Sequence, residues 1–163
     1  MAMLNQDLDY NLVSDNVKGA FSGRPEKVRL MPGTQLYRLI TANNNHNTPA
    51  PWWYTKKTFD DLVRRTGVFN LPLADVARSP LAVTTQWNPK MDWLSIIQIQ
   101  QPVFCLIGTI QYQPLNENDR SILLMGGLEQ VFLPGLASRS NPFDGTYART
   151  VYFGKADNVT PNL

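Results

Sequence analysis

Short apolar runs rich in β-branched and aromatic residues, separated by Gly, Pro and Asn, recur along the chain from residue 31 onward. Runs of about four to eight such residues between turn formers are typical of β-strands. The runs predicted as strands are Gln35–Ile40, Leu81–Trp87, Ser95–Gln100, Val103–Gln113 (one or two strands), Glu129–Leu133 and Thr150–Phe153. Most of the chain is therefore expected to form a β-structure.

Helical patterning occurs only before these later strands. Phe59, Leu62 and Val63 recur at helical spacing and predict a helix over Thr58–Arg65, with its first residue as the N-cap. A shorter helix is predicted over Leu73–Arg78. Helices that precede strands, instead of alternating with them, indicate an α+β domain and not repeated βαβ units.

The first 30 residues are polar and weakly patterned, and they are interpreted as a flexible or loosely docked lead-in. The whole chain has 163 residues, which fits one domain of about 100–200 residues. We therefore expect residues 1–30 to be a lead-in segment and residues 31–163 to be a single domain.

Composition narrows the classes of partner. The net charge is +2, only 17% of residues are charged, and Lys and Arg are scattered along the chain. No basic stripe of the kind that binds a phosphate backbone is present, so charge gives no support to a nucleic-acid partner. The N-terminus lacks the pattern of a signal peptide, and no apolar run approaches the ~20 residues of a membrane helix. A soluble chain without a membrane span is expected, and it could be a fragment of a longer polypeptide that is exported by other means.

The single cysteine excludes an intramolecular disulfide and a cysteine zinc cluster. Cys105 lies in an apolar run and is expected to be a buried small side chain. His46, the single histidine, lies in a polar loop, so a Cys/His nucleophile is disfavoured. We expect no metal site.

Two aromatic or basic features in the first half could serve a ligand. Arg38 lies on a predicted strand beside Tyr37; it is either a solvated ion-pair partner or an anchor whose guanidinium binds phosphate or carboxylate. The aromatic triplet at positions 52–54 follows a loop; it either packs into the core or supplies a stacking wall for a planar ring.

Two further features lie on later predicted strands. In Val83–Trp87, threonine hydroxyls either face solvent or form a cleft floor. In Gly126–Pro134, a glycine pair allows close backbone approach to a ligand and precedes a strand, although a plain hairpin turn has the same pattern. We expect this segment to line a working cleft, with Gln130 and Phe132 on one strand face and Glu129 on the other.

The order of these features resembles a known family. Leu36-Tyr37-Arg38, Val83-Thr84-Thr85 and Gly126–Pro134 are similar to the three core motifs of the ADP-ribosyltransferase superfamily. The Gly-Gly-x-x-Gln-x-x-x-Pro pattern is most similar to NAD glycohydrolase toxin domains of the tuberculosis-necrotizing-toxin type, which resemble domains of polymorphic and type VI secretion toxins. The resemblance covers roughly residues 31–136, and the order and spacing of its short motifs carry most of its weight.

The resemblance implies an α+β fold with a split β-sandwich, a short helical N-terminal part and a cleft that holds NAD(P)⁺. It implies that Arg38 binds the phosphates and that Gln130 faces the nicotinamide ribose, with Glu129 as the alternative if the register slips by one residue. The implied substrate contacts are Tyr37, Trp53, Tyr54, Thr84, Thr85, Gly126, Gly127 and Phe132. No cofactor beyond NAD(P)⁺ as substrate is expected.

The implied activity is an NAD(P)⁺ glycohydrolase toxin, a secretion-system effector of bacterial competition that is secreted and acts in the target-cell cytoplasm. An inhibitory immunity protein is the implied partner. Toxins that modify proteins generally use a glutamate at the key position, so Gln130 favours water as the acceptor. Two alternatives remain open: a mono-ADP-ribosyltransferase that modifies a protein or nucleic acid through Glu129, and a non-catalytic binding or immunity-type module.

Overall fold

A computed structural model describes residues 3–41, 51–85, 87–136 and 145–158. The strands are β1 Glu26–Leu30, β2 Gln35–Ile40, β3 Trp52–Thr55, β4 Trp93–Ile99, β5 Val103–Thr109, β6 Gln113–Pro114, β7 Leu123–Leu124, β8 Glu129–Phe132 and β9 Ala148–Lys155. The helices are α1 Asp15–Gly19, α2 Lys56–Phe69 and α3 Leu73–Leu81, with 3₁₀ turns at Tyr10–Leu12 and Ala156–Asn158. The fold is α+β, as expected, with helices joined to an antiparallel sheet.

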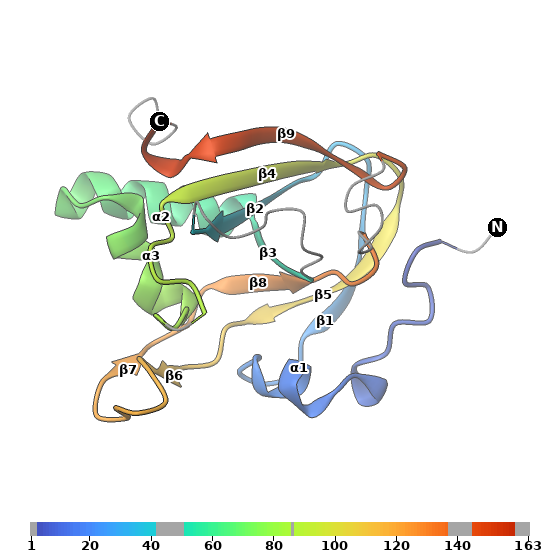
Figure 1. Ribbon diagram of the computed structural model, residues 1–163. Coiled ribbons are helices and arrows are strands. Elements are labelled where there is room, and N and C mark those ends of the chain that lie inside the picture. The colour runs from blue at the N-terminus through green and yellow to red at the C-terminus, as the bar shows by residue number, and fades with distance from the viewer. Residues whose placement is uncertain (1–2, 42–50, 86, 137–144, 159–163) are drawn as a thin grey trace.

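Seven strands follow one another in the order β1-β5-β8-β3-β2-β4-β9. Figure 1 shows β2, β4 and β9 above, β1, β5 and β8 below, and β3 between the two groups. The strand β3 pairs with β8 through Trp52 and Trp53, and with β2 through Tyr54 and Thr55. Its four residues therefore join two half-sheets.

The pairing between β2 and β3 is short. It comprises only Leu36 opposite Thr55 and Tyr37 opposite Tyr54, whereas β2 continues to Ile40 paired with β4 alone. Beyond Tyr37 the two strands therefore diverge, and the sheet is split at this point.

Two clusters of buried apolar side chains stabilise the two half-sheets. One lies between the sheet and the helices α2 and α3, and there the rings of Tyr37 and Phe59 stack with their centroids 4.3 Å apart. The other contains Trp53, Cys105 and Val131, which are at most 1% exposed. Burial raises the pKa of the Cys105 thiol to about 12. The expectation of a buried cysteine is confirmed, whereas His46 lies outside the described residues.

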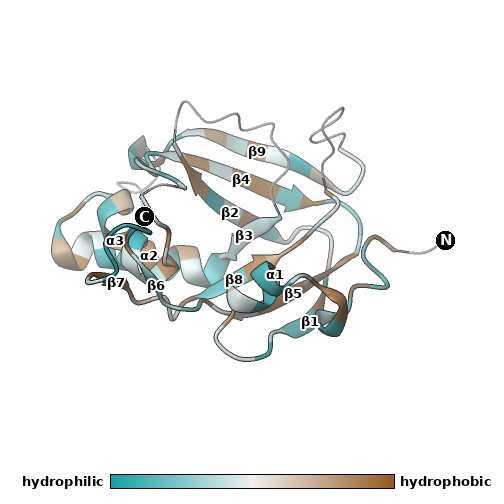
Figure 2. Ribbon diagram, turned by 60° about the horizontal axis from the view of Figure 1, so that its bottom comes forward, coloured by the Kyte–Doolittle hydropathy of each residue, from teal (hydrophilic) through white to brown (hydrophobic). Residues whose placement is uncertain are grey.

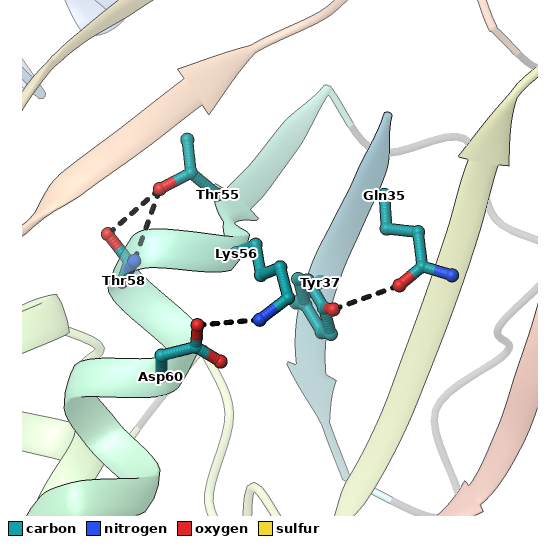
Figure 3. Close-up of polar contacts among 6 residues, drawn as sticks. All are labelled: Gln35, Tyr37, Thr55, Lys56, Thr58 and Asp60. Atoms are coloured by element: carbon teal, nitrogen blue, oxygen red, sulfur yellow. Dashed lines mark hydrogen bonds and ion pairs between the residues drawn. The ribbon is translucent and has the colours of Figure 1, made fainter. Parts of the chain in front are cut away.

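The helix α2 begins earlier and ends later than the sequence predicts. Its N-cap is Thr55: the Thr55 Oγ1 accepts a hydrogen bond from the backbone N of Thr58 and donates one to the hydroxyl oxygen of Thr58 (Figure 3). Lys56 and Asp60 form an ion pair at 2.7 Å over its first turn. The helix ends at Phe69, and Asn70 is its left-handed C-cap. The predictions of Thr58 as the N-cap and of Arg65 as the last residue are therefore wrong.

Two other sequence expectations require correction. The described residues of Leu81–Trp87 form no strand, because Leu81 ends α3 and Ala82 is its left-handed C-cap. The segment interpreted as a lead-in is docked on the sheet, since β1 pairs with β5 over Glu26–Leu30 and Phe21 is 5% exposed. The remaining predicted strands match β2, β4, β5, β8 and β9 within a few residues.

Candidate functional site

A cavity of about 750 Å³ opens where β2 and β3 diverge, within the size range of small-molecule sites, roughly 300–1,000 Å³. Its walls come from α1, the end of β2, β3, the segment after α3 and β8. The lining residues are Asp15, Asn16, Val17, Gly19, Ala20, Arg38, Leu39, Ile40, Trp52, Tyr54, Leu81, Ala82, Val83, Trp87, Asn88, Ile110, Gln113 and Gln130. The cavity therefore contains two of the three predicted catalytic residues, Arg38 and Gln130.

Arg38 lies on β2 just beyond the last residue that pairs with β3. It is half-buried, and its guanidinium carbon lies 6.0 Å from the ring centroid of Trp53. Desolvation lowers the pKa of Arg38. Among the described residues no carboxylate lies within ion-pair distance of its side chain. A partly desolvated guanidinium without a carboxylate is suited to bind an anionic ligand.

Gln130 projects from β8 and is 7% exposed. Its Nε2 donates a hydrogen bond to the backbone oxygen of Ala20 at 2.9 Å, which orients the carboxamide. Within the described part of the chain, Oε1 accepts no hydrogen bond from another side chain or backbone N–H. The carboxamide oxygen is thus available to a hydroxyl or a water in the cavity.

Glu129 lies on the opposite face of β8. Its carboxylate is 3.6 Å from Lys57 Nζ at the start of α2, and its backbone oxygen accepts a hydrogen bond from the Thr58 hydroxyl. It is not among the lining residues. The register therefore directs the carboxamide, and not the neighbouring carboxylate, to the cavity.

The predicted aromatic contacts are divided between the cavity and the core. Tyr54 and Trp52 line the cavity, whereas Trp53 is 1% exposed beneath Arg38. The ring of Tyr37 faces α2. Its hydroxyl donates a hydrogen bond to Oε1 of Gln35, on the same strand, at 3.1 Å (Figure 3). Burial raises the pKa of Tyr54 to about 12, against the opposing effect of the Arg38 charge, so its hydroxyl keeps its proton at neutral pH. The cavity thus has two aromatic walls from β3.

Phe132 packs against Trp52, with ring centroids 5.0 Å apart, and does not line the cavity. Neither do the two threonines. Thr84 is 6% exposed and its Oγ1 accepts a hydrogen bond from the Trp87 backbone N, so it holds a turn. Thr85 is exposed. The contribution of this segment comes instead from Trp87 and Asn88.

The glycine pair does not approach the cavity. Gly126 has φ of +66°, and a Cβ there would clash with the backbone oxygen of Ile110. Gly126 also lines a separate hollow of about 320 Å³ beside Phe69 and Met125. The sequence predicts close backbone approach to a ligand at this glycine pair, whereas Gly126 instead packs closely against the backbone of Ile110. From Gly126–Pro134 only Gln130 reaches the cavity.

Several lining residues were not predicted. Asn88 is held by its Nδ2, which donates to the backbone oxygen of Leu39 at 2.8 Å, and by Thr41, which donates to its Oδ1 at 2.6 Å. Trp87 precedes it and is 59% exposed, so its indole is accessible. The Asn88-Pro89 dipeptide is a turn signal that could have indicated a loop here. The α1 wall, with Asp15 and Asn16, has no comparable local signal.

The described residues contain no group of three or more His, Cys, Asp or Glu side chains placed to hold a metal ion. Among the same residues, no helix is both long and apolar enough to cross a membrane. The functional groups that line the cavity are the guanidinium of Arg38, the carboxamides and the aromatic side chains.

The sequence matches no protein-family model and no curated protein. The fold is similar to that of Rhs1-CT, solved in complex with its cognate immunity protein RhsI1, with a TM-score of 0.51, 13% identity and 80% of each chain covered. It is also similar to Tne2, solved in complex with Tni2, with a TM-score of 0.52, 13% identity, and 82% of this chain and 92% of that chain covered. At this identity the likeness concerns the backbone arrangement alone. The chain therefore shares its fold with Rhs1-CT and Tne2.

Proposed function

We propose that this chain is an NAD(P)⁺ glycohydrolase toxin domain, which cleaves the bond between nicotinamide and ribose to give nicotinamide and ADP-ribose. The observation that carries the proposal is that Arg38 and Gln130 line one cavity although they come from strands in different half-sheets. Arg38 supplies a cation without a carboxylate partner among the described residues, and a pyrophosphate has the matching charge and geometry.

The reaction requires little acid–base assistance. The bond between ribose C1′ and the nicotinamide nitrogen breaks with its electron pair going to nitrogen, which leaves as neutral nicotinamide. Water adds to C1′ and its proton goes to solvent. The transition state is oxocarbenium-like, as in other glycoside cleavages. The protein must therefore hold the substrate, shield the ring and position water.

The residues of the cavity match these tasks. Gln130 Oε1 accepts a hydrogen bond from a ribose hydroxyl or from the attacking water, while the bond to Ala20 fixes its orientation. Trp52, Tyr54 and Trp87 provide planar faces for the nicotinamide or adenine ring. Glu129 points toward Lys57, away from the cavity, which favours water over a macromolecular nucleophile as the acceptor.

The fold supports the toxin part of the proposal. Rhs1-CT was solved with a cognate immunity protein. By analogy, an inhibitory immunity protein is the expected partner of this chain, and the expected place of action is the cytoplasm of a target cell after secretion.

The test is an NAD⁺ consumption assay in which nicotinamide and ADP-ribose are separated and quantified. Arg38→Ala and Gln130→Ala should each reduce turnover at least about a hundredfold. Arg29→Ala, on an exposed face of β1, and Gln100→Ala, outside the cavity lining, are the matched controls and should turn over like the parent. Parental turnover by Gln130→Ala would remove the assigned role. Labelled macromolecules after incubation with labelled NAD⁺ and cell lysate would identify a transferase instead.

A further inference from the structure

The charged groups around the cavity are few. Of its described lining residues only Arg38 and Asp15 carry a formal charge, and they have opposite signs. Arg38 is half-buried on β2, whereas Asp15 is exposed on α1. The cavity thus has one cation toward its interior and one anion on its outer wall.

The wall that holds Asp15 is fixed on the sheet. Ala20, directly after α1, accepts hydrogen bonds from the backbone N of Gln111 at 3.0 Å and from Gln130 Nε2 at 2.9 Å. Figure 2 shows α1 lying across β8 and β5. Phe21 is buried against Trp52, with ring centroids 5.7 Å apart. The position of Asp15 is therefore set by the fold of its segment.

No cation neutralises Asp15 among the described residues. Lys18, one turn further along α1, is directed elsewhere: its Nζ donates to the backbone oxygen of Asn11 at 3.3 Å and lies 5.8 Å from the ring centroid of Tyr10. Lys18 is also outside the cavity lining. The carboxylate of Asp15 therefore has no ion-pair partner among the described residues of the cavity wall.

From this distribution we propose that the cavity selects NAD⁺ over NADP⁺, and that Asp15 is the residue that enforces the selection. The inference rests on the proposed function and specifies its substrate. The 2′-phosphate of NADP⁺ adds about −1.5 to −2 charges at neutral pH, the value for a phosphate monoester. Arg38 is the single lining cation of the described chain and is assigned to the pyrophosphate. The added phosphate would bring negative charge into a cavity whose described lining holds the carboxylate of Asp15 and no second cation.

The experiment compares kcat/KM for NAD⁺ and NADP⁺ in the purified chain, together with calorimetric titration of both nucleotides. A preference for NAD⁺ of about tenfold or more is expected, because like charges brought together in a site cost enough for that ratio. Asp15→Asn should reduce the ratio several-fold, and Asp15→Lys should reduce it further or invert it. The matched control, Asp7→Asn, removes an exposed carboxylate of the same segment that does not line the cavity, and should keep the parental ratio.

Salt gives a readout that a purely structural role of Asp15 would not produce. Raising the ionic strength screens exposed charges, so the preference for NAD⁺ should shrink in the parent and stay nearly constant in Asp15→Asn. Equal kcat/KM values for the two nucleotides in the parent would overturn the inference and leave the glycohydrolase intact. Preferential binding of NAD⁺ without cleavage would support the selection by Asp15 and refute the glycohydrolase activity. If neither nucleotide were bound or cleaved, both would be wrong.

Discussion

Gln130 Nε2 and the backbone oxygen of Ala20 are joined by a hydrogen bond of 2.9 Å across 110 positions of sequence. The bond fastens the wall that carries α1 to the strand that carries the candidate catalytic carboxamide. The oxygen of Ala20 also accepts from Gln111 N, so it keeps a partner when Gln130 is replaced.

Replacing Gln130 tests this connection. Gln130→Ala should lower the free energy of unfolding by about 1 kcal/mol, the net value of one hydrogen bond, and leave the chain folded. Gln130→Glu should cost more at pH 7, about 3 kcal/mol, because a buried carboxylate cannot donate to Ala20. As the pH falls the new carboxyl is protonated and can donate again, so the deficit should shrink by pH 4. Urea denaturation at the two pH values measures this, and a Glu variant as stable as the parent at pH 7 would contradict it.

Arg38 and Arg78 should respond in opposite ways to substitution by methionine. Arg38 has no carboxylate partner among the described residues and is partly desolvated, so Arg38→Met should leave the free energy of unfolding unchanged or raise it by about 1 kcal/mol while removing nucleotide binding. Arg78 donates to the backbone oxygens of Val83 and Pro89, at 3.0 and 2.9 Å. Arg78→Met should therefore cost about 1–3 kcal/mol. Denaturant midpoints of the two variants, with calorimetric binding of NAD⁺, check the contrast; equal losses of stability would refute it.

The adjacent glycines should differ in tolerance. Both have positive φ, +66° at Gly126 and +100° at Gly127, but only at Gly126 would a Cβ meet backbone atoms, those of Ile110 and Gln111. Gly127→Ala should cost about 1–2 kcal/mol from backbone strain alone, and Gly126→Ala about 3 kcal/mol or more. Thermal unfolding followed by circular dichroism distinguishes them. If Gly127→Ala proved the worse substitution, the packing of this turn on Ile110 would be wrong.

Alkaline pH should destabilise the fold through buried acids. Burial raises the pKa of Tyr54 to about 12 from 10.0, so between these values the unfolded chain loses the phenolic proton while the folded chain retains it. Stability from this group is fully present below pH 10 and is lost as the pH rises toward 12, by about 2 kcal/mol. Cys105, whose pKa burial raises from 9.0 to about 12, adds a further loss of stability that begins near pH 9.

Stability curves from pH 8 to pH 11.5 test this expectation. Tyr54→Phe should flatten the decline above pH 10, whereas Tyr112→Phe, at a side chain that is 55% exposed, serves as the control and should follow the parent. A Tyr54→Phe curve parallel to that of the parent would show that this phenol does not contribute.

Much of the sheet follows from local patterns. The strand β2 has the predicted bounds Gln35–Ile40, because turn residues flank a run with strong strand preference. Val83–Trp87 has the same kind of composition, but its described residues form no strand. There the left-handed C-cap at Ala82 and the hydrogen bond to Thr84 Oγ1 decide the backbone, and neither is encoded in β-propensity.

The site was predictable to a similar extent. Arg38 and Gln130 line the cavity, as the order of the motifs along the chain predicts. Strand alternation explains why Gln130 faces the cavity and its neighbour Glu129 faces Lys57. The α1 wall depends on the long-range bond between Gln130 and Ala20 and on the burial of Phe21. No local pattern in a polar segment indicates such contacts, since they are fixed only when distant strands have assembled.

The join at β3 has a consequence for synthesis on the ribosome. Trp52 and Trp53 complete their pairing only with Phe132 and Val131, so most of the chain must emerge before the two half-sheets can be linked. Because loop closure over so long a segment is slow, the cavity is expected to be among the last features to assemble. A nascent chain that ends before residue 129 lacks both β8 and Gln130, and under the proposed function it would have no glycohydrolase activity in the cell that makes it.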